Sequence, residues 1–479
     1  MQVPRLRHRA LVLLLLAACG AFAHTPTEVR WPEPRPQPRP VPMALMQPNF
    51  QAPSAEHCAR PVSTREVPGR GMEEAVLRRE ARDELSRTEG GVAGAARKSL
   101  AAPASAFAPA APAAAAIAQR APSPTEAQAD AGSSAVTAGV VDDNADFSAY
   151  LSFRQRNARI VHRQRDVRER YLLEVKDPRG VGVLDAEVAV QSPSGATLWA
   201  RTDAAGRAWL HPDAFDPSGA RDYAVSVRKA GQQASARLQR GQRSAVEVVL
   251  NAPPEPPRAR LDLVFLIDAT GSMADEIDKL KATLRTITAE VAALPSRPDI
   301  CLGLVAYRDK GDAFLLRTHD FTNDVASFLR DALLPLQAAG GGDYPEAMNE
   351  AFHETVHQLS WRGNGATRLV VLLADAPPHL DYGGPYYDDD MLVALGKGIK
   401  VFAVGASGLD RQGEMIQRQI AQFTGGRFVF LTYADARRPS SGPGRETVHD
   451  VKNYSVDTLD RLVVRLVSEE LARRGGAGG

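Results

Sequence analysis

The C-terminal part of the chain alternates between apolar runs that suit buried strands and apolar stripes that suit helices. Residues 261–267 form an almost continuous apolar run, as expected of a central parallel strand covered on both faces. In the segment that follows, apolar residues recur every three or four positions, which predicts a helix with one face in the core. These positions are Ile277, Leu280, Leu284, Ile287, Val291 and Leu294.

The same alternation continues to the end of the sequence. Further strands are predicted at 301–307, 315–318, 369–374, 399–404 and 427–431. Further helices are predicted at 346–359, 415–423 and around 459–467. Strands and helices that alternate at these lengths predict a doubly wound, Rossmann-like α/β domain over residues 259–473.

Residues 168–251 have a different pattern, with short alternating runs separated by Gly, Pro and Asp turns. This pattern predicts an all-β, antiparallel sandwich. The order Val-x-Asp-x-x-Gly, Ala-x-Val-x-Val and Thr-Asp-x-x-Gly-Arg resembles the carboxypeptidase-regulatory-like, or transthyretin-like, sandwich family. The resemblance implies a non-catalytic support or adhesion module. The proline-rich segment 252–258 is interpreted as a stiff linker that separates the two domains.

The region upstream of these domains lacks the patterns of a folded core. Residues 20–145 contain a proline at every second position from Pro32 to Pro42 and an alanine-rich stretch interrupted by proline, so we expect a disordered tether. Residues 146–167 are rich in arginine. Without interleaved aromatic residues, this lead-in is interpreted as a solvated face in preference to an anion-binding patch.

The first nineteen residues have the form of an export signal. Three arginines precede an apolar run at 10–18 that is too short for a permanent membrane anchor. The sequence Leu16-Ala-Ala-Cys19 resembles a bacterial lipobox, which implies lipidation of Cys19 and membrane attachment through that lipid. A rival cleavage after Ala23 would release a soluble form. Under either cleavage, we expect a protein exported to the cell envelope.

Composition excludes two classes of protein. The 479 residues include 58 Lys and Arg against 57 Asp and Glu, so the whole chain lacks the basic excess of a nucleic-acid binder. Three cysteines do not make a disulfide scaffold. A disulfide between Cys58 and Cys301 is possible, but nothing in the sequence brings the two residues together, so free thiols are favoured.

Hard oxygen ligands cluster where the first predicted strand ends. Asp268, Thr270 and Ser272 occupy alternate positions of one loop, and Asp375 ends a later strand. Ligands of open α/β sheets bind beyond the carboxyl ends of the strands, so these groups are candidates for a Mg²⁺ or Mn²⁺ site. Asp343, in a glycine-rich turn before a helix, is a further candidate ligand. The competing interpretation is that Asp268 and Ser272 only cap the following helix.

Together these motifs resemble the von Willebrand factor type A (VWA) family. The matching segments are Asp-x-Thr-x-Ser, Gly-Gly-Gly-Asp-x-Pro-Glu-Ala, Leu-Leu-Ala-Asp-Ala-Pro-Pro-His, 303–309 and 420–428. The resemblance implies a metal-ion-dependent adhesion site (MIDAS) that binds a protein partner, often through the partner's acidic side chain. It assigns Asp268, Thr270, Ser272 and Asp375 to the metal. Mg²⁺ is the favoured cation, with Mn²⁺ and Ca²⁺ as alternatives.

The chain departs from the family where the family usually has a threonine, because Gly342-Asp343 stands there. If Asp343 reaches the metal, a third carboxylate would hold the cation more tightly. It would also make the cation less electrophilic toward a partner's acid. Metal binding is therefore predicted more firmly than adhesion through an acidic side chain.

Two other motifs suggest possible metal sites. His353-Glu354-Thr-Val-His357 matches the zinc-protease signature, but apolar neighbours predict that both histidines lie on the outer face of a helix, together with Glu346 and Glu350. No third ligand follows in the sequence, so a solvated face is favoured. The segment 386–390 is interpreted as an acidic helix start in preference to a second cation loop.

These interpretations predict an exported, lipid-anchored protein that binds another protein through a metal-dependent VWA domain. It is expected not to be an enzyme and not to bind nucleic acid. One alternative is a zinc metallohydrolase that uses residues 353–357. Another is a purely structural envelope protein whose fold the metal stabilises.

Overall fold

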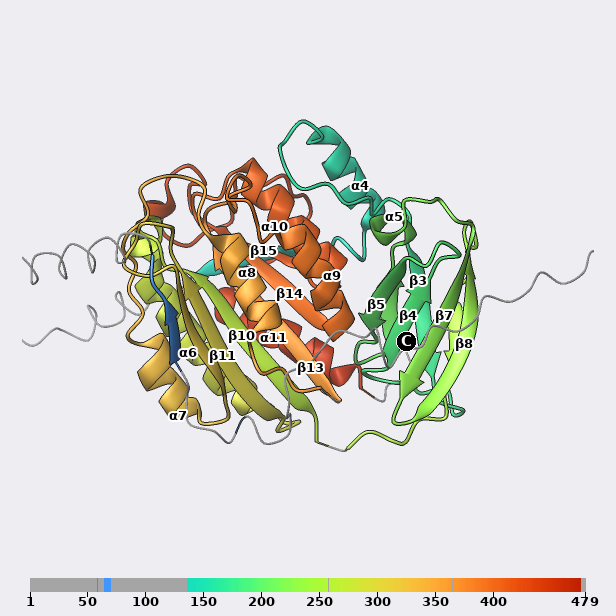
Figure 1. Cartoon of the computed structure of the whole chain (residues 1–479). Helices are drawn as coiled ribbons and strands as arrows, with labels where there is room; N and C mark the ends of the chain where they lie inside the picture. Colours follow the sequence, from blue (N-terminus) through green and yellow to red (C-terminus); the bar gives the residue numbers. More distant parts are fainter. Residues whose placement is uncertain (1–57, 59–63, 70–135, 257, 364, 475–479) are drawn as a thin grey trace, which may run out of the picture. The chain divides into compact units, whose positions relative to one another are not determined.

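The computed structural model describes residues 58, 64–69, 136–256, 258–363 and 365–474 (Figure 1). The predicted signal, the predicted lipidation site Cys19 and most of the predicted tether lie outside these residues. Within the part described, no helix has the length and apolar character needed to cross a membrane.

A nine-stranded mixed sheet forms the larger domain. Across the sheet the strands are β1 (Thr64–Val67), β12 (Leu316–Thr322), β11 (Asp299–Tyr307), β10 (Arg260–Asp268), β13 (Ala366–Ala374), β14 (Ile399–Gly405), β15 (Phe428–Thr432), β2 (Thr137–Val141) and β16 (Val456–Thr458). The five strands from β11 to β15 are parallel, and the other four run antiparallel to their neighbours. The chain therefore winds outward from β10 in both directions.

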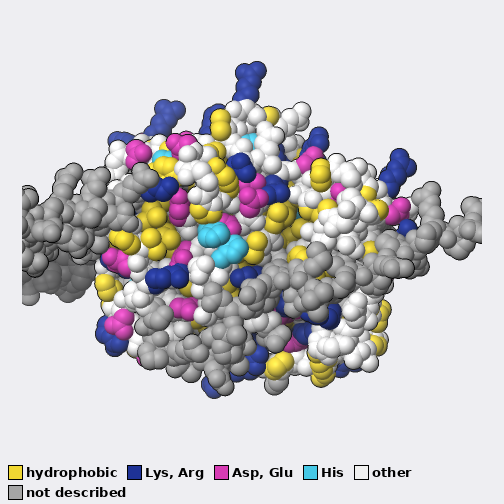
Figure 2. Space-filling view, in the orientation of Figure 1, with side chains coloured by type: hydrophobic (Ala, Val, Ile, Leu, Met, Phe, Trp, Pro, Cys, Tyr) yellow, Lys and Arg dark blue, Asp and Glu magenta, His cyan; other side chains and the backbone are white. Residues whose placement is uncertain are grey.

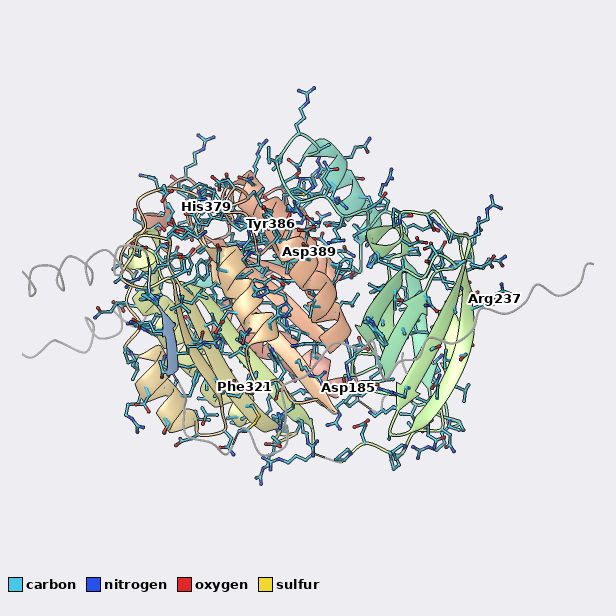
Figure 3. The ribbon with its side chains drawn as sticks, in the orientation of Figure 1. Asp185, Arg237, Phe321, His379, Tyr386 and Asp389 are labelled. Atoms are coloured by element: carbon cyan, nitrogen blue, oxygen red, sulfur yellow. A yellow bond between two sulfur atoms is a disulfide. The ribbon has the colours of Figure 1, made fainter. Side chains whose placement is uncertain are left out.

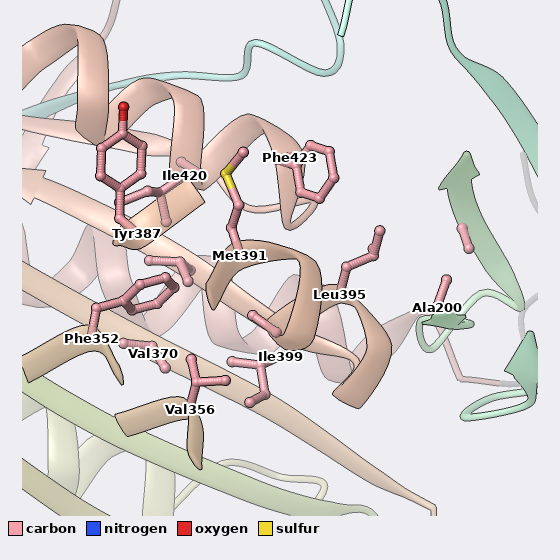
Figure 4. Packing of buried hydrophobic residues seen from close by; sticks show 14 of the residues in the cluster. Ala200, Phe352, Val356, Val370, Tyr387, Met391, Leu395, Ile399, Ile420 and Phe423 are labelled. Carbon is pink, nitrogen blue, oxygen red and sulfur yellow. The ribbon is translucent and has the colours of Figure 1, made fainter. Parts of the chain in front are cut away.

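Helices cover both faces of this sheet. One face carries α6 (Ala274–Ala292), α11 (Leu459–Ala472) and the short segments α7 (Val325–Ser327) and η3 (Phe328–Leu333), and the other carries α8 (Met348–His357), α9 (Tyr387–Lys397) and α10 (Arg411–Phe423). Along β10, Phe265 and Ile267 pack into the α6–α11 core, while Val264 and Leu266 pack into the core under α8–α10. Figure 4 shows this second core. The predicted α/β architecture with two covered faces is confirmed.

Residues 171–249 form two smaller sheets. One contains β6 (Arg207–Leu210), β3 (Tyr171–Lys176) and β9 (Val246–Val249), and the other contains β5 (Thr197–Arg201), β4 (Glu187–Gln191), β7 (Asp222–Lys229) and β8 (Gln232–Gln239). The expectation of purely antiparallel pairing was wrong, because β3 and β9 are parallel. The sequence of β8, Gln-Gln-Ala-Ser-Ala-Arg-Leu-Gln, has few large apolar residues and does not by itself predict a strand, and hydrogen bonding to β7 holds it in the sheet. Two short helices, α4 (Phe147–Arg156) and α5 (Pro212–Phe215), complete the fold.

Two strands come from the segment predicted to be a disordered tether. β1 pairs with β12, and β2 lies between β15 and β16 in the large sheet. Just after β2, the carboxylate of Asp143 accepts a hydrogen bond of 2.6 Å from Arg418 of α10, and both side chains are 3% exposed. The prediction for residues 20–145 was therefore wrong at these two strands, which are too short to be recognised without the strands beside them.

The expectation of two free thiols was also wrong. Cys58 and Cys301 form a disulfide, with their Cα atoms 5.4 Å apart and 243 positions apart in sequence. Cys301 lies in β11, and the backbone oxygen of Cys58 accepts a hydrogen bond of 2.6 Å from the amide of Asn323, just beyond β12. The edge strand β1 brings this upstream segment to the sheet, which the sequence could not show.

The arginine-rich lead-in is not a free solvated face. Arg163 and Arg165 form ion pairs of 2.9 and 3.3 Å with Asp388, in the first turn of α9. The guanidinium of Arg170 stacks over two aromatic rings, and burial lowers its pKa to about 10. The acidic start of α9 is confirmed, and Arg163 and Arg165 of the lead-in pair with two of its three acids, Asp388 and Asp389.

A buried ion-pair cluster joins the smaller sheets to the larger domain. Asp185, labelled in Figure 3, accepts hydrogen bonds of 2.9 Å from both Arg201 and Arg368. Burial alone would raise the pKa of Asp185, but the two guanidinium groups lower it to about 2. Arg368 belongs to β13, so this carboxylate connects the two domains through the central sheet.

Replacing Asp185 with alanine should strongly destabilise the protein, because it removes the carboxylate that two buried guanidinium groups share, although Arg201 keeps a second carboxylate beside it, that of Glu187. We expect a loss of about 3–5 kcal/mol in the free energy of unfolding, measured by urea denaturation. As a control, Arg179→Ala removes an arginine that is 71% exposed and should leave the midpoint nearly unchanged. Equal midpoints for Asp185→Ala and the wild type would contradict this assignment.

Strand β2 should be essential for the stability of the larger domain. A fragment spanning 146–474 lacks β2 and leaves the edge of β15 unpaired and the buried Arg418 without Asp143. We expect it to aggregate or to melt well below a fragment spanning 136–474. Thermal denaturation and size-exclusion chromatography of the two fragments test this, and similar behaviour of both would show that β2 is dispensable.

Candidate metal centre

The predicted ligands Asp268 and Asp375 meet at one edge of the large sheet. Asp268 is the last residue of β10, and Asp375 directly follows β13. The two strands are parallel neighbours in register, with Ile267 opposite Leu373, so the two carboxylates emerge side by side. Because β11 and β13 lie on opposite sides of β10, the winding direction reverses here, and a crevice at this point is expected of an open α/β sheet.

The loop after β10 folds its hydroxyl groups onto the Asp268 carboxylate. The Thr270 hydroxyl donates to Asp268 Oδ1 over 2.7 Å, and the Thr270 amide donates to the same oxygen over 3.0 Å. The hydroxyls of Thr270 and Ser272 lie 3.1 Å apart. Asp268 and Thr270 are fully buried, whereas Ser272 is exposed. The oxygen cluster therefore has a buried floor and one open side.

One oxygen of each of the two carboxylates lacks the partner that a buried charge normally has. Asp268 Oδ2 and Asp375 Oδ1 are buried and accept no hydrogen bond from any described residue. Burial raises the pKa of Asp268 far above its usual range, and the charge of Asp375 adds to the increase. Burial also raises the pKa of Asp375, and the charge of Glu276 acts in the same direction. Such a pair fits a hard divalent cation, which would supply the missing positive charge.

The helix-capping interpretation is not supported. The residue at the cap position of α6 is Met273, and neither it nor Thr270, which precedes the short helical turn η2 (Gly271–Met273), makes a side-chain capping bond. Asp268 instead binds within its own loop.

Asp343 lies beside a neighbouring cluster. Its side chain is 65% exposed, and its carboxylate lies 3.9 Å from Nε2 of His379. His379 lies in turn 3.6 Å from Asp309, which accepts a hydrogen bond of 2.8 Å from Tyr382. The structure thus brings Asp268, Thr270, Ser272 and Asp375 together and orients Asp343 toward His379 and Asp309.

Glu346 is the site residue that the sequence analysis missed. It was placed on the outer face of a helix, but it precedes α8 and is only 2% exposed. A Cβ atom added to Gly341 would lie 2.9 Å from Glu346 Oε1 and 3.3 Å from Thr270 Cβ, so Glu346 lies close to the Thr270 loop. Burial raises the pKa of Glu346 to about 9, with the charge of Asp268 as the next cause. The Pro-Glu pair after the glycine turn was the available signal.

The two histidines of the zinc-protease motif face outward, as predicted, but the glutamate does not lie with them. His353 and His357 are 41% and 30% exposed, and both contact Asp390 of α9. Glu354 is buried on another side of α8, where it pairs with Arg65 of β1 and accepts a hydrogen bond of 2.8 Å from Thr318 of β12. Since Glu354 is held by the sheet edge, the metallohydrolase alternative lacks its general base.

Comparison with known families bears on this site directly. Residues 262–435 match the model of the von Willebrand factor type A domain. The chain carries a von Willebrand factor type A domain. The matched segment runs from β10 to just beyond β15. Four elements of the larger domain lie outside this segment: the strands β1, β2 and β16 and the helix α11.

Two curated proteins are similar to part of the chain. The alpha-protein kinase vwkA of Dictyostelium discoideum is 32% identical over 120 residues, which are 25% of this chain and 19% of the kinase. A putative ariadne-like RING finger protein, R811, of Acanthamoeba polyphaga mimivirus is 30% identical over 125 residues, 26% of this chain and 12% of that protein. The chain therefore spans less than a fifth of either relative.

Among solved structures, the chain is similar to the pilus adhesin SpaC from Lactobacillus rhamnosus GG in an open conformation. The identity is 14%, the TM-score is 0.27, and the match covers 44% of this chain and 31% of the adhesin.

Stability without a divalent cation should fall as the pH rises. The pKa of Glu346 is about 9 in the fold and that of Asp268 is raised, whereas free carboxyls titrate near pH 4. Between pH values near the pKa of free carboxyls and those near the raised pKa values, the folded state binds more protons than the unfolded chain. Raising the pH through this range therefore lowers the free energy of unfolding, on the order of a few kcal/mol. Melting temperatures in chelator at about pH 5 and about pH 8 test this.

Adding Mg²⁺ should raise the melting temperature more at the higher pH, where the carboxylates are ionised. Asp268→Asn should flatten both the pH dependence and the response to Mg²⁺. A metal-free protein that is more stable at the higher pH would contradict the assignment.

Proposed function

We propose that this protein binds another protein through a divalent cation held by Asp268, Thr270, Ser272 and Asp375 of its VWA domain. The observation that carries the proposal is the pair of buried carboxylate oxygens without hydrogen-bond partners, beside the buried hydroxyl of Thr270 and the exposed residue Ser272. Oxygen-only ligands favour hard cations, so Mg²⁺ is the first candidate, with Mn²⁺ and Ca²⁺ as alternatives.

Each residue of the proposed site has a distinct role. Asp268 and Asp375 supply charge from the sheet edge, and Thr270 holds Asp268 Oδ1 through two hydrogen bonds. Ser272 lies on the exposed side, where a partner would approach. When bound, a divalent cation would offer a coordination position to an acidic side chain of the partner.

We also propose that the protein is a binding protein and not an enzyme. The zinc-protease motif at 353–357 does not have the geometry of a protease site, because Glu354 forms an ion pair with Arg65 and accepts a hydrogen bond from Thr318. The two smaller sheets are proposed to be a carboxypeptidase-regulatory-like sandwich that supports the VWA domain. In keeping with this role, Asp185 ties them to β13 by a buried ion pair.

The proposed location is the cell envelope, with export through the N-terminal signal and attachment through a lipid on Cys19. The disulfide between Cys58 and Cys301 supports export, because such bonds persist in oxidising compartments.

The decisive experiment is a pull-down from envelope extract with purified protein, in Mg²⁺ or in chelator. We expect partner capture in Mg²⁺ and loss of capture in chelator or with Asp268→Ala. Asp278→Ala is the matched control, because this aspartate lies on nearby α6 and its side chain is 85% exposed. It should capture the partner normally.

Two results would refute the proposal. Capture that persists in chelator and with Asp268→Ala would show binding independent of the cation. A melting temperature lowered by chelator, together with unchanged capture, would favour the structural alternative.

A further inference from the structure

We propose a second cation site of different chemistry, in which His353, His357 and Asp390 bind a divalent transition metal such as Zn²⁺ and fasten α8 to α9. It goes beyond the proposed function, which uses only the oxygen ligands at the sheet edge. Histidine side chains reach the surface on this face of the molecule (Figure 2).

The three side chains converge on one point. His353 Nδ1 lies 3.0 Å and His357 Nε2 lies 2.9 Å from the same oxygen, Asp390 Oδ1. One ligand atom from each residue lies within 4.8 Å of the others. Tetrahedral zinc with bonds near 2 Å separates its ligands by about 3.3 Å, so the two nitrogen–oxygen distances need to lengthen by only a few tenths of an ångström to accommodate the ion.

Secondary structure pre-organises this arrangement. The two histidines are four positions apart on α8, which places them on one helical face, and their rings stack with centroids 4.2 Å apart. Asp390 lies in the first turn of α9, and its side chain is only 5% exposed. Beneath the cluster, Phe352 of α8 and Met391 of α9 pack in the same core (Figure 4). The ligands therefore project from two packed helices and need little reordering.

The donor set selects the class of metal. Two imidazole nitrogens and one carboxylate oxygen suit zinc and related transition ions, whereas Mg²⁺ prefers oxygen donors alone. Without a metal, the same contacts act as hydrogen bonds between the imidazoles and the carboxylate. Metal would thus compete with protons for these atoms.

The position of Glu354 gives this site a structural character. In a zinc protease the glutamate between the histidines would activate a metal-bound water, but here it is ion-paired with Arg65 across the sheet edge. With His353 and His357 partly exposed, the remaining coordination positions would face water. The metal would therefore bridge two helices without Glu354 beside it as a base.

Titration of the tag-free, full-length protein with Zn²⁺ and with Co²⁺, in saturating Mg²⁺ to fill the oxygen site, tests the proposal. Calorimetry should show one Zn²⁺ per chain, and Co²⁺ should give visible absorption bands. The double variant His353→Ala/His357→Ala should bind Zn²⁺ more than about tenfold more weakly, since even losing a supporting residue around a metal costs that much.

Matched variants separate this site from its surroundings. Glu354→Gln alters the residue between the histidines and should keep Zn²⁺ binding, as should Asp268→Asn, which removes the oxygen site. Asp390→Asn preserves the shape of the side chain and should also weaken Zn²⁺ binding. This variant keeps the test possible if the double variant folds poorly. A wild type without a one-to-one Zn²⁺ site, or unchanged affinity in both ligand variants, would overturn the proposal.

Discussion

The burial of carboxylates at the carboxyl edge of the parallel strands is the constraint around which this VWA domain is organised. Asp268 and Asp375 end up side by side because β10 and β13 are adjacent and in register. Glu346 approaches them from the glycine-rich loop. Burying unpaired negative charge costs free energy, and the fold tolerates it only because the surrounding sheet is well packed on both faces.

Several other buried charges among the described residues are paired. Asp185 is neutralised by two arginines, Arg418 by Asp143 and Glu414, and Arg362 by Asp262. The unpartnered oxygens at the sheet edge differ from these pairs, and this contrast supports the proposed cation site. Asp262 and Asp268 lie in the same strand, β10, yet Asp262 pairs with Arg362, whereas one oxygen of Asp268 lacks a partner.

Helix α8 links several of these features. Glu346 just before its start belongs to the acidic edge, Glu354 in its middle holds β1 through Arg65, and His357 at its end contacts α9. These residues contact three different neighbours, so one short segment connects the proposed metal centre, the edge strand and the neighbouring helix. This arrangement explains why the zinc-protease spacing occurs without the protease geometry.

The sequence by itself determined the local features of the protein. Apolar periodicity located the central strands and the main helices of the VWA domain, and the loop motif identified Asp268, Thr270, Ser272 and Asp375 as neighbours at a sheet edge. Residue type and spacing are enough here, because the carboxyl ends of parallel strands necessarily share an edge. The acidic start of α9 was also readable, since acids favour helix N-termini.

Tertiary structure alone decided the long-range pairings. The disulfide joins cysteines 243 positions apart, and β1 and β2 exist only because the open edges of a distant sheet bind them. The orientation of Glu354 and the contact of Asp390 with the histidines likewise depend on which elements surround α8. A sequence pattern indicates the local structure of each segment. These contacts instead depend on which elements are neighbours in space, and so on the order of the strands across the sheet.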